Sequence, residues 1–275
     1  MAKGDMIVAA DTHVHGYPRH DLAVLFDAAM RALARAAGAP RGAAAFPPGA
    51  CGVLCFTDAA ADRGFARLRA AVGKAPPAPG LVVEALAEPE ALRLRRADGA
   101  ALHAIGGFQV VTRERLEVLA LGAREAPPGG RALDDTVRRV REAGAVPVLP
   151  WAPGKWLGGR GRAMRRFVEE SSPGDFVLAD SRLRPTVWPE PAILRLARDR
   201  GFKIVAGSDP LAPSADAAAA GSYATVYRDV PFDEARPAVS MRALLAGADG
   251  RRAGRRIGPL ALLRLLRRHA AAMRG

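Results

Sequence analysis

The sequence predicts an α/β fold in which strands and helices alternate around a β/α barrel. Short apolar runs alternate with amphipathic stretches along most of the 275 residues, a pattern that favours parallel strands joined by helical crossovers. Polar residues repeatedly follow the ends of these runs, and in a β/α barrel the carboxyl ends of the strands carry the active site. Because barrels of this length commonly form one domain, we expect residues 1–275 to be a single domain.

The first predicted strand is the apolar run 7–10, which leads directly into Asp11, His13 and His15. Alternate residues of a strand point to the same face, so the two histidines lie about 7 Å apart along the strand on one side of it. Neutral imidazoles can share a metal ion such as Zn, Fe, Ni or Cu. The alternative is one packed core histidine and one surface histidine. We favour the metal site, because Asp11 precedes the pair and a buried strand lies beneath it.

The next elements are predicted as follows. A helix begins at the N-cap Asp21, and its apolar residues recur at helical spacing. A second buried strand, residues 52–58, ends in Asp58. Extended stretches joined by the turn signal 97–99 then interrupt the alternation and predict a β-hairpin insertion at about residues 84–115.

Regular alternation returns after this insertion. The predicted helices are 133–143, 162–170 and 191–200, and the predicted strands are 146–150, 176–179 and 203–206. An amphipathic basic helix is expected at about residues 259–273, with leucines on one face and arginines on the other. Packing against the barrel is the default for this helix, and contact with a membrane surface or with nucleic acid is the alternative.

The charge of the chain is strongly basic. The formal net charge is +13, and residues 251–275 contain eight arginines and no carboxylate. Such an excess of positive charge is typical of proteins that bind nucleic acids or anionic membranes. We favour a compositional bias on a solvated face, because the aromatic residues that would stack on bases are not interleaved with the basic cluster.

The cysteine content and the apolar segments of the sequence indicate which cellular compartment to expect. Two cysteines, Cys51 and Cys55, are too few for a disulfide framework and fit a reducing environment. The N-terminus lacks the apolar core of a secretory signal, and no run of about twenty apolar residues offers a membrane span. We therefore expect a soluble, cytoplasmic protein with no transmembrane segment.

A glycine-rich loop after the strand 146–150 carries Lys155 and Arg160. Glycines permit close backbone approach, and two cations suit an anionic group such as phosphate. The order of a P-loop is absent. The alternative is an ordinary flexible loop with Trp151 and Trp156 packed at the rim of the barrel, and the sequence favours neither.

Two aspartates follow later strands. Asp180 is expected to form an ion pair with Lys155 or Arg184, and the alternative role is that of a general base. Asp209, in the segment Gly-Ser-Asp-Pro, can ligate a metal and accept a proton from bound water. A helix-capping role with Pro210 at the first helical position is the alternative for Asp209.

Several of these motifs resemble the polymerase-and-histidinol-phosphatase (PHP) domain, a family of metal-dependent phosphoesterases with a distorted TIM-type barrel. The similar segments are Asp-Thr-His-Val-His at 11–15, Thr-Asp at 57–58, residues 107–112 and Gly-Ser-Asp-Pro at 207–210. The order of the motifs matches over roughly residues 6–210. The resemblance implies a PHP-like barrel and a hydrolytic activity on phosphoesters.

This sequence also departs from the family pattern. Gln109 stands where the resemblance places a bridging glutamate. Family histidines are replaced at or near four positions, which are Ala59, Leu119, Trp151 and Leu211. The remaining ligands are His13, His15 and Asp209, with Glu117 or His20 as possible additions. The resemblance therefore implies one divalent ion (Zn, Mn or Fe) instead of three.

The function expected from these observations is a divergent PHP-like hydrolase with a mononuclear site and a small phosphorylated substrate. The expected catalytic residues are Asp209, Lys155 and Asp180. The expected substrate-binding residues are Arg160, Arg184, Gln109 and Trp151. The alternative is a catalytically inactive PHP-like scaffold that binds RNA or a phosphorylated ligand through basic residues. The sequence names neither the substrate nor the oligomeric state.

Overall fold

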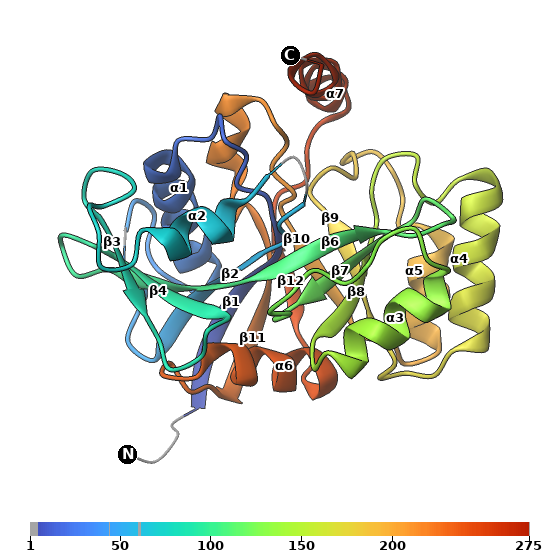
Figure 1. Cartoon of the computed structure of the whole chain (residues 1–275), viewed down its shortest axis with the longest axis horizontal. Helices are drawn as coiled ribbons and strands as arrows, with labels where there is room; N and C mark the ends of the chain where they lie inside the picture. The colour runs from blue at the N-terminus through green and yellow to red at the C-terminus, as the bar shows by residue number, and fades with distance from the viewer. Residues whose placement is uncertain (1–4, 44, 60–61, 275) are drawn as a thin grey trace.

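The computed structural model describes residues 5–43, 45–59 and 62–274, and its strands form two sheets (Figure 1). In spatial order, the seven-stranded sheet contains β12 (Arg251–Gly254), β11 (Tyr223–Pro231), β1 (Asp5–Val14), β2 (Ala50–Phe56), β5 (Ala101–Ile105), β4 (Ala91–Arg96) and β3 (Leu81–Ala85). The five-stranded sheet contains β10 (Ile204–Gly207), β9 (Val177–Ser181), β8 (Val146–Pro150), β7 (Glu117–Leu121) and β6 (Gly107–Val111).

The helices lie between and around these strands. They are α1 (Leu22–Ala36), α2 (Gly64–Ala70), α3 (Leu133–Glu142), α4 (Gly158–Glu170), α5 (Ala192–Asp199), the 3-10 helix η1 (Ser214–Ala219), α6 (Pro237–Gly247) and α7 (Pro259–Ala272). The predicted α/β class is confirmed. Among the described residues, no helix has the length and apolar character needed to cross a membrane.

The two sheets meet at two seams and do not close into one barrel. At the first seam, the Thr12 hydroxyl donates to the Ala206 carbonyl (3.0 Å), and the Asp209 N–H donates to the His13 carbonyl (2.8 Å). At the second seam, Asp58 N–H donates to the Gly107 carbonyl at 2.9 Å. The predicted barrel is therefore corrected to two sheets whose edges touch through isolated bonds.

The predicted hairpin insertion is larger than expected. Strands β3, β4 and β5 form consecutive antiparallel pairs, and β6 and β7 form another. The predicted turn joins β4 to β5, and Gly99 there has a φ of 88°, a conformation that favours glycine. Because β5 also pairs in parallel with β2, while β6 and β7 belong to the five-stranded sheet, the predicted insertion is divided between the two sheets.

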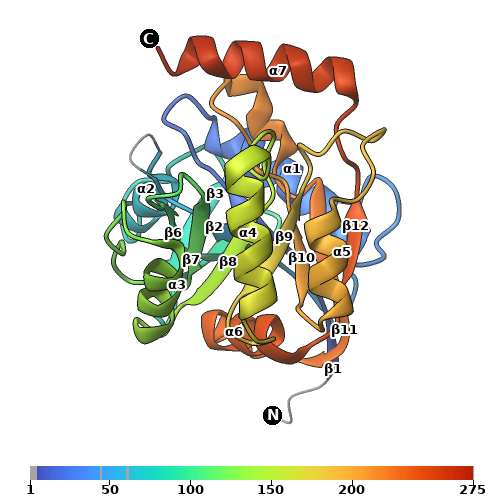
Figure 2. The ribbon, with the colours of Figure 1, turned by 90° about the vertical axis from the view of Figure 1, so that its right-hand side faces the viewer.

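Three apolar clusters hold the layers together. Valines of β1, β2 and β8 fill the space between the sheets, with α6 beneath them. Helix α1 covers the seven-stranded sheet through residues such as Met30 and Leu33. Helices α3, α4 and α5 cover the outer face of the five-stranded sheet (Figure 2). Strands such as β1, β2 and β9 are buried along nearly their whole length. Because successive residues of a strand point to opposite faces, these strands supply the two apolar faces that the layers require.

Helix α7 lies apart from these layers, above the ends of the strands (Figures 1 and 2). The amphipathic helix is confirmed at the predicted place, but its packing is sparse. Leu262 is its one buried residue among those described, and it packs near Leu183 and Leu211. Leu260 and Leu263 remain exposed. The body of the protein therefore buries Leu262 and covers Leu265 and Leu266 in part.

Asp180 is the centre of a buried ionic network at the end of β9. Its carboxylate accepts from the Arg184 guanidinium at 2.6 and 2.7 Å, from Arg252 at 2.9 Å and from the Tyr223 hydroxyl at 2.9 Å. Burial raises the pKa of Asp180, but the bonds and charge of Arg184 outweigh it and hold this pKa below its ordinary value. The expected ion pair of Asp180 with Arg184 is confirmed.

Replacement of Asp180 by alanine leaves the buried Arg184 guanidinium without its carboxylate partner and removes one of the two carboxylate partners of Arg252. We expect Asp180→Ala to lower the free energy of unfolding by about 3–5 kcal/mol, measured by urea denaturation at neutral pH. Glu169→Ala, which removes an exposed partner of Arg165, is the control and should change it by less than about 0.5 kcal/mol. Equal effects of the two substitutions would contradict the proposed stabilising role of the network.

Candidate metal centre

Three predicted ligands converge at the first seam. His13 and His15 lie at the end of β1, and Asp209 follows β10. A Cβ atom at Gly207 would collide with His13, so glycine at this position permits the close approach of the two strands. Asp209 has a φ of 48°, a left-handed conformation that a non-glycine residue adopts only where the surrounding structure enforces it. The backbone thus aims the carboxylate at the two histidines.

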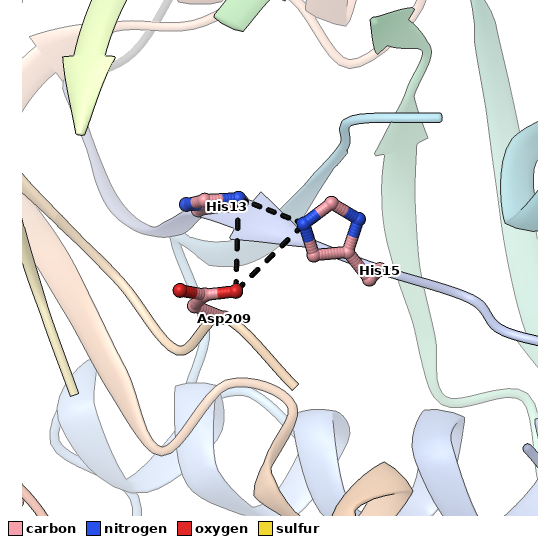
Figure 3. A group of neighbouring side chains, drawn as sticks. All are labelled: His13, His15 and Asp209. Atoms are coloured by element: carbon pink, nitrogen blue, oxygen red, sulfur yellow. Dashed lines mark hydrogen bonds and ion pairs between the residues drawn. The ribbon is translucent and has the colours of Figure 1, made fainter. Parts of the chain in front are cut away.

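The three buried side chains face one another (Figure 3). The Nε2 atoms of His13 and His15 are 3.0 Å apart, and Asp209 Oδ1 lies 3.8 and 3.7 Å from them. Tetrahedral zinc with bonds of 2.0–2.1 Å places its ligand atoms about 3.3 Å from one another. Shifts of a few tenths of an ångström therefore fit this donor set to one ion.

The environment of the two histidines separates their pKa values. Burial lowers the pKa of His13, against the opposing charge of Asp209. Burial also disfavours the charged form of His15, but the bond and charge of Asp62 outweigh it and raise the pKa of His15 to about 9. The raised pKa favours the protonated form of His15, whose Nδ1 faces Asp62 and whose Nε2 faces His13. A metal ion would replace the proton between the two Nε2 atoms, because both imidazoles must bind it in the neutral form.

Asp62 orients His15 from behind. The Asp62 carboxylate lies 2.7 Å from Nδ1 of His15, so the imidazole presents Nε2 to the cluster. Carboxylate–histidine pairs of this kind fix the tautomer and the ring orientation of metal ligands. Asp62 could not be identified from the sequence, because it lies 47 positions from His15 and no short motif links the two.

Two other predicted residues, Gln109 and Lys155, lie beside the triad of His13, His15 and Asp209. Gln109 Oε1, on β6, is 3.2 Å from His13 Nε2. Lys155 pairs with Glu117 at 2.7 Å, and the charge of Glu117 favours the protonated forms of both histidines. The structure therefore brings Gln109, Glu117 and Lys155 to the triad from three different segments.

The remaining predicted site residues make their contacts elsewhere. Arg184 bonds to Asp180 and to a carbonyl, and the Arg160 guanidinium donates to the Gly154 carbonyl at the surface. Trp151 is buried in the apolar layer under α4 and α5. The glycine-rich loop is also shorter than predicted, because α4 already begins at Gly158.

The mouth of the site is covered by aromatic rings. Tyr17 lies 5.6 Å from His15, 5.3 Å from His20 and 6.2 Å from His269 of α7, measured between ring centroids. His20, a possible additional ligand, contacts the Leu211 carbonyl at 2.8 Å instead. The triad side chains are at most 7% exposed. Tyr17 therefore lies against His15, and His269 of α7 lies against Tyr17.

The capping alternative for Asp209 is not supported. The following helix η1 has Pro213 at its N-cap, and the carboxylate of Asp216 receives the nearby Leu211 N–H at 2.7 Å. Within the part of the chain that the structure describes, the contacts of the Asp209 side chain are those with His13 and His15. Asp58, by contrast, does act as a cap, because its carboxylate accepts the N–H groups of Phe65 and Ala66 at the start of α2.

No protein-family model and no curated protein matches the chain. Among solved structures, it is similar to PsfC from Pseudomonas syringae PB-5123, with 15% identity, a TM-score of 0.55, and coverage of 97% of this chain and 99% of PsfC. A two-domain protein from Bacteroides vulgatus ATCC 8482 that contains a predicted PHP-like metal-dependent phosphoesterase has 13% identity and a TM-score of 0.47, with coverage of 97% and 71%. The first similarity shows a shared fold, and the second is too weak to support an argument.

The contact between Asp62 and His15 predicts a measurable loss of metal affinity. We expect Asp62→Asn to weaken binding of one equivalent of Zn²⁺ by about 10–100-fold, because the amide neither fixes nor polarises the imidazole in the same way. Competition with a fluorescent chelator measures the affinity. Asp27→Asn, which removes an exposed partner of Arg96, is the control. An unchanged affinity in Asp62→Asn would contradict the assigned orientation of His15.

Proposed function

We propose that the chain is a hydrolase of small phosphoesters that uses one divalent ion, Zn, Mn or Fe. The observation that carries this proposal is the buried convergence of His13, His15 and Asp209, with donor atoms at separations close to those of a tetrahedral site. The resemblance of the surrounding motifs to the PHP family supports the phosphoester as substrate class. A cytoplasmic location is part of the proposal, since Cys51 and Cys55 are buried free thiols.

The side chains of the site divide the chemical tasks among them. When bound, the ion lowers the pKa of a water molecule and polarises a phosphoryl oxygen. Asp209 uses Oδ1 toward the histidines, so its second oxygen is free to accept the proton of the attacking water. Lys155 supplies a positive charge for the substrate phosphate, and Gln109 can donate from its amide nitrogen while Oε1 faces His13.

Other predicted residues support this site indirectly in the proposal. Asp180 and Arg184 hold the end of β9 through their mutual ion pair, and Arg160 fastens its loop through the Gly154 carbonyl. Access requires a movement of Tyr17, whose ring lies against His15 and His269. A movement of helix α7 would break the contacts of Leu262, Leu265 and Leu266 and the hydrogen bond from the Ala212 N–H to His269 Nδ1.

A phosphatase assay with defined metal content tests the proposal. We expect wild-type protein reconstituted with Zn, Mn or Fe to hydrolyse p-nitrophenyl phosphate or a member of a phosphoester panel, and to lose turnover with a chelator. Asp209→Asn and His13→Ala should lower kcat by about 10²–10⁴-fold and lose bound metal in elemental analysis. His103→Gln, which changes a buried histidine that pairs with Glu234, is the control. Metal-loaded protein without turnover, or full activity in His13→Ala, would contradict the proposal.

A second candidate function is an inactive scaffold that binds RNA through α7. The observation that favours it is that Arg264, Arg267 and Arg268 are all exposed and form no ion pair with the described residues. Exposed arginines without carboxylate partners are available to phosphates. The same helix covers the triad through His269, so RNA on α7 would lie at the mouth of the site.

The salt dependence of RNA binding distinguishes this candidate. We expect neutralisation of Arg264, Arg267 and Arg268 to alanine to reduce the slope of log affinity against log salt by about two, because each phosphate contact contributes about 0.7 on single strands. The matched control replaces Arg138, Arg139 and Arg141 of α3, each of which pairs with a carboxylate. Filter binding with a single-stranded RNA gives both slopes. Equal slopes, or no binding at low salt, would exclude this function.

A further inference from the structure

A cavity of about 380 Å³ lies where the N-terminal ends of α4 and α5 meet the loop after β8. The chain contains three tryptophans, and all three line this cavity: Trp151, Trp156 and Trp188. The residues of the metal centre are not part of its lining. In an aromatic-poor chain, three indoles around one cavity call for an explanation beyond core packing.

Two of the three indoles are buried in the wall of the cavity, and the third lies at its exposed edge. Trp151 and Trp156 are 6% and 8% exposed and belong to the apolar layer under α4 and α5, so their rings are held in place. Trp188 is 46% exposed, and its ring meets Trp151 edge to face at a centroid distance of 6.4 Å. Leu157, which also lines the cavity, is exposed as well. Exposed apolar side chains around a concave, aromatic-lined site are typical of ligand binding.

The cavity is also positively charged. Arg162 and Arg165 of α4 line it, and none of its described lining residues is a carboxylate. Arg165 has an exposed partner, Glu169, at 3.4 Å, and Arg162 forms no ion pair with the described residues. The N-cap residues of α4 and α5, Leu157 and Pro191, provide no capping side chain. The first N–H groups of both helices therefore add to the attraction for an anion.

We propose that this cavity binds a nucleoside monophosphate, with the base stacked on the tryptophans and the phosphate at Arg162 and Arg165. The aromatic wall suits a planar ring, because stacking of bases on aromatic side chains is favourable for every base. The guanidinium groups of Arg162 and of Arg165, whose one carboxylate partner Glu169 is exposed, suit a phosphate. The volume lies at the lower end of small-molecule sites, about 300–1,000 Å³, which favours one nucleotide over a larger ligand. This inference is independent of the hydrolase activity.

Tryptophan fluorescence reports directly on this cavity, because all indoles of the chain line it. The experiment uses the full-length His13→Ala variant, so that turnover does not consume the ligand. It is titrated separately with AMP, GMP, CMP and UMP, and with adenosine and inorganic phosphate. We expect saturable quenching by nucleotides with a Kd below about 1 mM, and weaker binding of adenosine or phosphate alone.

Substitutions test separately how the cavity binds the base and the phosphate of the nucleotide. Trp188→Ala should weaken AMP binding about fivefold or more, and Trp188→Phe should retain most of it. Arg162→Ala should weaken binding of AMP but not of adenosine. Arg166→Ala, on the same helix but outside the cavity lining, is the matched control and should bind AMP as the parent does.

Three results would overturn this proposal. The first is the absence of saturable quenching by any of the four nucleotides. The second is AMP affinity that is unchanged in both Trp188→Ala and Arg162→Ala, with folding verified by circular dichroism. The third is binding of an RNA oligonucleotide without binding of any mononucleotide. If Trp188→Ala does not fold, Trp188→Phe together with Arg162→Ala still decides the outcome.

Discussion

The buried carboxylate of Asp11 is the interaction on which the first seam depends. It accepts the N–H of Ser208 at 2.9 Å, the N–H of Gly221 at 2.8 Å and the N–H of His13 at 3.2 Å, and it also bonds to the Ser208 hydroxyl. Burial raises the pKa of Asp11 to about 6, although these bonds work in the opposite direction. One side chain of β1 thereby fastens both the segment after β10 and the segment before β11. A buried charge is costly unless it is fully hydrogen-bonded, and here that cost is offset by three backbone donors.

This seam explains how a site forms without a closed barrel. In a continuous ladder, backbone pairing between neighbouring strands would set the separation of His13 from Asp209. Here the hydrogen bond from Asp209 N–H to the His13 carbonyl and the absence of a side chain at Gly207 set it instead. The left-handed conformation of Asp209 is tolerated because both flanking segments are fixed. Thus the strain and the close approach occur at the same place as the candidate ligands, as expected for a functional site.

The spacing of residues along the sequence was sufficient to predict part of the candidate metal centre. Alternation within β1 placed His13 and His15 on one side, and a carboxylate at a later strand end completed the set. The ion pair of Asp180 with Arg184 was also predictable, because the two residues lie four positions apart. Asp62 and His269 were not, since each reaches the site through tertiary contacts across 47 and more positions. The division into two sheets could not be predicted either. The periodicity of a strand does not indicate whether its edge pairs continuously with the edge of the next strand.

The charges around the triad bear on how many ions it can hold. Asp62, Asp209 and Glu117 bring three negative charges, and Lys155 with a protonated His15 brings two positive ones. A single divalent ion in place of the shared proton makes this group neutral, the least costly state for charges in a buried site. A second divalent ion would give these five side chains an excess of two positive charges. Gln109, a neutral side chain in contact with His13, fits this balance, since a glutamate there would leave a negative charge that a single ion does not neutralise.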